Sequence, residues 1–147
     1  MDIEKTLKDI SSGDNHLAWS AGWCIIKANA IDLNEIPLDS IAVIRTAVEK
    51  LPAPECPSVA DSREIPKLAL KILEHKESNT CRCNLYKSAQ RFLPEEEQVR
   101  GYILIEKKND IPWEPEFHCK CLSCGKKYFV HESHSYHYPW AEWSAIT

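Results

Sequence analysis

Two closely spaced pairs of cysteines are the residues of this chain best suited to chemistry. Cys81 and Cys83 form the first pair, and Cys121 and Cys124 form the second. Gly125 follows the second pair and accepts backbone angles that a side chain resists, so the chain can reverse there and aim two thiolates at one point. Structural Zn²⁺ sites bind four thiolate or imidazole ligands in a closed tetrahedron. The two pairs therefore predict one structural zinc site with these four cysteines as ligands.

Cys119 is an alternative ligand. It lies two residues before Cys121, and alternate residues of an extended strand face the same side. It is a candidate to replace one member of the upstream pair, but the turn from Cys121 to Cys124 already supplies two ligands. We interpret Cys119 as a thiol beside the site or a spare thiol, and we expect His118 to point to the opposite face.

Disulfide bonds and redox catalysis are the alternatives to a metal. The chain has seven cysteines, Cys24 and Cys56 have no obvious partner, and the N-terminal residues lack the apolar core of a secretory leader. A redox Cys-x-x-Cys motif usually places its first sulfur at a helix N-terminus, whereas residues 125–129 are typical of a turn that enters a strand. These features favour structural zinc.

Apolar residues in the first half repeat at the spacing of amphipathic helices. The clearest helix should start at an Asp39 N-cap and end before Pro52. Its expected buried residues are Ile41, Ile44, Val48 and Leu51. A helix is also predicted over residues 2–11, and another should begin with Pro66 at its first position. The expected buried residues of this last helix are Leu68, Ile72 and Leu73.

A helix over residues 14–28 is predicted as well, with a strand over residues 23–26 as the alternative because Gly22 interrupts the segment. Leu17, Ala21, Cys24 and Ala28 should share its buried face, with Trp19 and Trp23 stacked beside them. Residues 34–37 are expected to break the helical pattern, and the proline-rich residues 52–66 are expected to form a loop.

The second half favours strands. Residues 99–107 are rich in apolar and β-branched side chains, although a helix starting at Pro94 is an alternative. Residues 116–130 predict a hairpin around the second cysteine pair. Helices first and strands last indicate an α+β fold, with N-terminal amphipathic helices packed on a small C-terminal antiparallel sheet that carries a Cys₄ zinc site. We expect a single domain over residues 1–147, with a mainly helical half (1–78) and a zinc-stapled β half (79–147).

Composition restricts the possible partners. The 147 residues carry 18 basic and 22 acidic side chains, a net charge of −4, which disfavours a broad phosphate-binding surface. The longest apolar run, residues 102–105, is too short to cross a bilayer. We therefore expect a cytoplasmic protein that does not insert into membranes.

The C-terminal segment combines histidines with large aromatic residues. Exposed Tyr and Trp side chains are favoured where proteins bind one another. The candidate partner-binding residues in this segment are Tyr136, Tyr138, Trp140 and Trp143. The alternative is that these rings close over the hairpin as part of the core. His131, His134 and His137 are interpreted as ordinary hydrogen-bonded or surface histidines.

No motif for catalysis is present in the sequence. None of the four glycines lies in a phosphate-binding loop, and the zinc-deaminase pattern is absent. With four thiolates on the metal, no position remains to activate water. We therefore expect a protein that is not an enzyme.

Two resemblances follow from these residues. The Cys121-x-x-Cys124-Gly125 step, with Cys81 and Cys83 as its partners, resembles the knuckle of zinc-ribbon and rubredoxin-type proteins. The short helices, the late cysteine hairpin and the closing residues 138–143 together resemble the small immunity proteins encoded beside bacterial polymorphic toxins. This second resemblance implies a protein that binds and neutralises one cognate toxin.

The acidic run should contact a basic catalytic cleft of such a toxin. Its residues are Glu95, Glu96 and Glu97. The alternative function is a zinc-ribbon protein that binds nucleic acid through Lys120, Lys126, Lys127 and nearby aromatic rings. The negative net charge favours the toxin inhibitor, so a nucleic-acid partner is not our first expectation.

Overall fold

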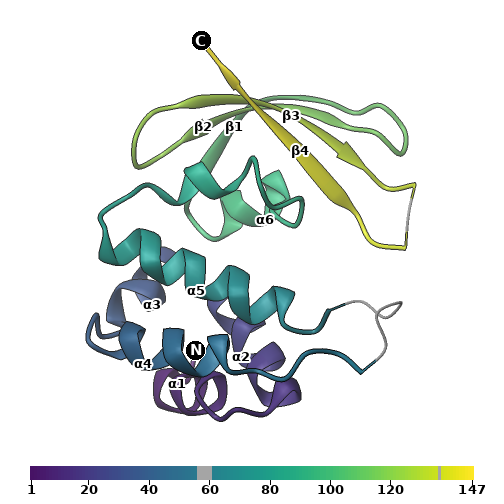
Figure 1. The fold of residues 1–147 in the computed structure, drawn as a ribbon. Coiled ribbons are helices and arrows are strands. Elements are labelled where there is room, and N and C mark those ends of the chain that lie inside the picture. The colour runs from purple at the N-terminus through teal and green to yellow at the C-terminus, as the bar shows by residue number, and fades with distance from the viewer. Residues whose placement is uncertain (56–60, 136) are drawn as a thin grey trace. The chain divides into compact units, whose positions relative to one another are not determined.

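A computed structural model describes residues 1–55, 61–135 and 137–147 (Figure 1). The chain forms two compact units, Met1–Thr80 and Cys81–Thr147. The first unit holds helices α1 to α5, and the second holds a four-stranded antiparallel sheet. The expected α+β class is thus confirmed. Among the described residues, no helix combines the length and apolar character needed to cross a bilayer.

In the described residues of the first unit, 1–55 and 61–80, the chain forms five helices. Asp2, Asp14 and Asn29 cap the first three, because each side chain accepts a hydrogen bond from a backbone N–H in the first turn. The helices are α1 (Ile3–Ile10), α2 (Asn15–Lys27), α3 (Ala30–Glu35), α4 (Ser40–Glu49) and α5 (Glu64–Glu77). The short helix α3 was not expected from the sequence, and it ends in the predicted break.

The helix over residues 14–28 is confirmed as α2, and half of its expected buried face is correct. Ala21 and Ala28 are buried, but Leu17 is 40% exposed and Cys24 is exposed, and Ile25 and Ile26 are buried instead. Gly22 lies on the buried side, where an added Cβ would stand 3.1 Å from the Ile65 side chain. A glycine is needed here because α2 and α5 approach closely.

Helix α4 buries the expected residues and starts directly after Asp39, the predicted N-cap position, although the expected capping bond is not made. Ile41, Ile44, Val48 and Leu51 are all buried. Asp39 has a helical backbone and makes no side-chain cap. The chain enters α4 instead through a tight turn in which the Ser40 N–H donates to the Pro37 carbonyl.

Helix α5 begins earlier than expected. Its first residue is Glu64, so Pro66 is the third helical residue and not the first. Proline is tolerated there because the first-turn N–H groups have no partner within the helix. Leu68, Ile72 and Leu73 are buried as predicted.

The sheet of the second unit is a simple meander in which each strand pairs with the next (Figure 1). Its strands are β1 (Ile103–Asn109), β2 (Glu116–Cys121), β3 (Lys127–Ser133) and β4 (Trp140–Ile146). The hairpin predicted over residues 116–130 is confirmed as β2 and β3. Alternate residues Phe117, Cys119 and Cys121 are buried, while the residues between them are exposed. A register shift between Ile105 and Lys107 interrupts the pairing of β1 with β2.

Both interpretations of the segment after Pro94 are correct in part. Residues 94–99 form helix α6 (Pro94–Val99), and the strand expected over residues 99–107 is confirmed from Ile103 onward as β1. Gly101, with φ +88°, makes the turn between them. Cys83 lies in a short 3₁₀ helix, η1 (Arg82–Leu85), and Cys81 directly precedes it.

The C-terminal aromatic residues divide between core and surface. Trp143 is 5% exposed, its indole N–H donates to the Phe92 carbonyl at 2.8 Å, and its ring stacks on Tyr86 at 4.2 Å between centroids. The prediction that Trp143 binds a partner is therefore corrected. Side chains alternate between the two faces of β4, and that of Trp143 points into the core. Tyr138 is 56% exposed and Trp140 is half-buried. Tyr136 lies outside the described residues.

Trp143→Ala should destabilise the second unit. We expect the free energy of unfolding to fall by about 3–5 kcal/mol, as is typical when a buried Trp is truncated to Ala. Tyr138→Ala is the matched control and should cost no more than about 1 kcal/mol, because its ring is 56% exposed and stacks with the Arg91 guanidinium at the surface. Denaturant unfolding followed by near-UV circular dichroism measures both. Equal losses in the two variants would contradict the assignment of Trp143 to the core.

Candidate metal centre

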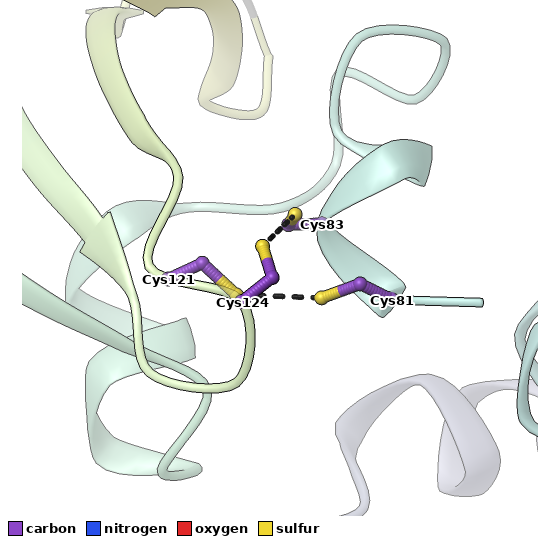
Figure 2. A group of neighbouring side chains, drawn as sticks. All are labelled: Cys81, Cys83, Cys121 and Cys124. Atoms are coloured by element: carbon purple, nitrogen blue, oxygen red, sulfur yellow. Dashed lines mark hydrogen bonds between the residues drawn. The ribbon is translucent and has the colours of Figure 1, made fainter. Parts of the chain in front are cut away.

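The four cysteines selected by their spacing lie together in the second unit (Figure 2). Their Sγ atoms all lie within 4.8 Å of one another. The closest pairs are Cys81 with Cys121 at 3.4 Å and Cys83 with Cys124 at 3.5 Å. These distances are far longer than the S–S bond of a disulfide, which is about 2.05 Å. They are close to the S–S edge of about 3.8 Å that follows from a tetrahedron with metal–sulfur bonds of about 2.3 Å. The four thiols can therefore bind one metal ion.

The turn after β2 positions Cys121 and Cys124. The Gly125 N–H donates to the Cys121 carbonyl at 2.9 Å, and the Cys121 N–H donates to the Lys126 carbonyl at 2.8 Å. Gly125 has φ +77°, which favours glycine. The backbone N–H of Lys126 donates to the Cys124 sulfur and lowers the pKa of this thiol to about 7. The turn thus favours the thiolate form that a metal binds.

The start of η1 positions the other pair. Cys81 precedes the 3₁₀ helix in an extended conformation, and Cys83 lies in its first turn. The Tyr128 hydroxyl, on β3, donates to the Cys83 carbonyl at 3.2 Å. Burial raises the pKa values of Cys81 and Cys83. Both thiolates lose hydration in these positions, and a metal ion at the centre of the four sulfurs would supply the compensating positive charge.

A buried ion pair fixes the residue between these two cysteines. The Arg82 guanidinium binds both carboxylate oxygens of Glu97, at 3.1 and 3.0 Å, and the Glu97 side chain is 0% exposed. The Tyr86 hydroxyl donates to Glu97 at 2.6 Å, and Arg100 binds it at 3.0 Å. Four hydrogen bonds thus surround one buried carboxylate.

The same ion pair connects the two halves of the metal site. The Arg82 guanidinium lies 4.0 Å from the centre of the Tyr102 ring, over its face. The Tyr102 carbonyl accepts a hydrogen bond from the N–H of Leu122, which lies between Cys121 and Cys124. Arg82 therefore contacts a residue that holds the opposite cysteine turn. Apart from the spacing of three residues between Glu97 and Arg100, nothing in the sequence indicates this arrangement.

The prediction that Glu97 contacts a partner is therefore corrected. Glu95 and Glu96 are exposed, but the Glu97 carboxylate lies inside the second unit because Arg82, Arg100 and Tyr86 bind it there. The acidic run looks uniform in the sequence, and the helical rotation of α6 turns its third glutamate inward.

Cys119 lies outside the group of four. It is 1% exposed, and burial raises its pKa to about 12, so its thiol is protonated at neutral pH. His118 is exposed on the opposite face, as expected from the alternation of the strand, and its ring contacts Phe129 at 5.5 Å between centroids.

Loss of any of the four cysteines should remove the bound metal. We expect purified wild-type protein to contain one metal ion per chain, and Cys121→Ser to contain none, because a hydroxyl is a poor substitute for a thiolate ligand. Elemental analysis after gel filtration measures the ratio. Cys119→Ala and Cys24→Ser are the controls and should keep one ion per chain. Loss of metal in Cys119→Ala would contradict the assigned group.

Glu97→Gln should destabilise the second unit strongly. Glutamine keeps the volume but leaves Arg82 without its buried counter-charge, which costs about 3–5 kcal/mol of unfolding free energy for a broken buried pair. Glu96→Gln is the matched control, since Glu96 also binds Arg100, at 3.1 Å, but is exposed. We expect it to cost at most about 1 kcal/mol. Denaturant unfolding compares the two, and similar losses would contradict a special role for the buried carboxylate.

Comparison with known proteins does not assign the chain to a family. No family model matches it, and neither a curated protein nor a solved structure gives a match. The resemblances to zinc-ribbon proteins and to toxin-immunity proteins stay predictions from the sequence, and the function has to be argued from the site and the surface.

Proposed function

We propose that this protein is a non-catalytic, cytoplasmic protein-binding protein: an immunity protein that binds and neutralises a cognate bacterial toxin, with one structural zinc ion. The observation that carries the proposal is an exposed acidic and aromatic surface on the second unit. Trp113 on this surface is 72% exposed. The side chains of Glu95 and Asp110 are 60% and 80% exposed.

Zinc is the metal that best suits the four cysteines. Four sulfur ligands in a tetrahedral arrangement are typical of Zn²⁺ or iron–sulfur sites, and Zn²⁺ fills the four positions of a structural site without redox chemistry. A site filled by four thiolates has no open position for water or a substrate. In this proposal, zinc holds two segments of the second unit together and takes no part in a reaction.

The surface chemistry supports a protein partner. Trp is among the residues that contribute most binding energy at protein interfaces. Carboxylates around it are complementary to a basic surface, which steers association and rejects acidic partners. A toxin with a basic catalytic cleft offers such a surface.

A second candidate is nucleic-acid binding, and one observation favours it. Lys120 and Lys127 pair across β2 and β3 on the exposed side of the sheet, next to the ring contact between His118 and Phe129. Bases stack on such rings, and lysines bind phosphates. However, Lys127 lies 3.5 Å from the Glu106 carboxylate. This acidic neighbour weakens phosphate binding, so we rank the second candidate below the first.

Co-expression with the neighbouring open reading frame of the native host tests the first function. We expect the neighbouring product to inhibit growth when expressed alone, to become harmless with this protein, and to co-purify with it. Growth curves and affinity purification measure the two effects. The proposal is wrong if the protein neither protects cells nor retains the product of that frame.

The double variant Lys120→Glu and Lys127→Glu separates the two candidates. Under the toxin proposal it should protect cells as well as the wild type does. Under the nucleic-acid alternative, wild-type protein should bind labelled single-stranded or double-stranded nucleic acid with an affinity that falls steeply with salt, and the double variant should not bind.

A further inference from the structure

A hollow of about 310 Å³ lies beside the turn between β1 and β2. It lies entirely within the second unit, and the metal centre uses none of its residues. Two aromatic rings and three carboxylates give it its chemical character. These residues are Trp113, Phe117, Glu95, Asp110 and Glu132. Its volume is at the lower end of the range for ligand sites, about 300–1,000 Å³, and suits one side chain better than a large cofactor.

Lys108, which lines the hollow, shows that a cationic group can bind there. The Lys108 ammonium lies 5.6 Å from the centre of the Phe117 ring. It also lies 2.7 Å from a Glu95 oxygen and 3.0 Å from an Asp110 oxygen. An aromatic face with carboxylates around it is the arrangement that binds organic cations. The hollow therefore already holds one cationic group on one of its two rings.

Within the part of the chain that the structure describes, no cation lies over the other ring, that of Trp113. Trp113 is 72% exposed, and its backbone is fixed because its carbonyl accepts the His134 N–H at 2.9 Å. The backbone that carries the ring is therefore already ordered, and only side-chain rotation of Trp113 is lost when a partner binds. Tryptophan is also the aromatic side chain that binds cations best.

The charge around the second ring favours another cation. Glu132 is 7% exposed and contacts the His134 ring, which also lines the hollow. The hollow contains three carboxylates and one lysine ammonium, so its charge stays negative while His134 is neutral. A negative, partly apolar hollow rejects acidic side chains and attracts basic ones.

We propose that this hollow binds an arginine side chain of the protein partner, with the guanidinium stacked on Trp113 and bonded to a carboxylate of the hollow. This inference rests on the proposed function as a protein-binding protein and specifies the group that is recognised. Arginine fits better than lysine because its planar group stacks on an aromatic ring and forms two parallel hydrogen bonds to one carboxylate.

A short peptide tests the hollow without knowledge of the partner. The probe is an end-capped Gly-Arg-Gly-Arg-Gly peptide, and its citrulline counterpart keeps the shape without the charge. We expect saturable binding of the arginine peptide to the full chain by NMR titration at low salt, and at least tenfold weaker binding of the citrulline peptide. Equal binding of the two peptides, or no saturable binding of either, overturns the proposal.

Trp113→Ala locates the binding. Trp113 has φ +67°, and alanine keeps a Cβ at the same backbone angle, so the substitution removes the ring and little else. We expect at least tenfold weaker binding of the arginine peptide, and Trp113→Phe should recover part of it. Tyr138→Ala removes another exposed ring and is the control, with an affinity within twofold of the wild type. An equal loss in Tyr138→Ala, or none in Trp113→Ala, overturns the proposal.

The growth assay separates failure of this inference from failure of the proposed function. Protection that is equal for wild type and Trp113→Ala, with no peptide binding, removes the arginine site and leaves the immunity function. Peptide binding that depends on Trp113, in a protein that protects against no toxin, supports the arginine site and removes the immunity function.

Discussion

The second unit depends on the close approach of two cysteine pairs that are distant in the sequence. The paired residues are 40 and 41 positions apart, yet their sulfurs lie 3.4 and 3.5 Å from each other. Closing a loop of this length on folding costs conformational entropy. A crosslink lowers the entropy of the unfolded chain, so less entropy is lost when the chain folds. The unit has 67 residues, a size at which a hydrophobic core alone gives little stability. A bound metal ion is a common solution for domains of this size.

The buried carboxylate of Glu97 also orders the interior of the second unit. A buried ion pair contributes little net stability, because both charges lose their water, but it is costly to break. Its effect is geometric here. Arg82 lies between two of the cysteines, and Glu97 allows its guanidinium only one orientation. In that orientation the guanidinium also lies over the Tyr102 ring, next to the backbone that bonds the turn of the second pair.

Sequence patterns predicted those features that depend on nearby residues. The spacing of Ile41, Ile44 and Val48 was enough to place α4, and two cysteine pairs with Gly125 were enough to select the sulfurs that the structure brings together. Glu97 was misjudged because the burial of a carboxylate depends on Arg82, which is fifteen residues away. Strand β4 was missed because its inward side is set by pairing with β3 and not by its own composition.

The irregular pairing of β1 affects how the protein behaves in concentrated solution. A sheet of this order has two outer strands, and an outer strand with free backbone groups invites another polypeptide to add to it. In β1 the Gln98 side chain accepts the Ile105 N–H at 2.7 Å, and the shift before Lys107 bends the strand. Charged side chains follow at Lys107 and Lys108. These features disfavour strand exchange between copies along this side of the sheet and so protect the protein from fibrous self-association.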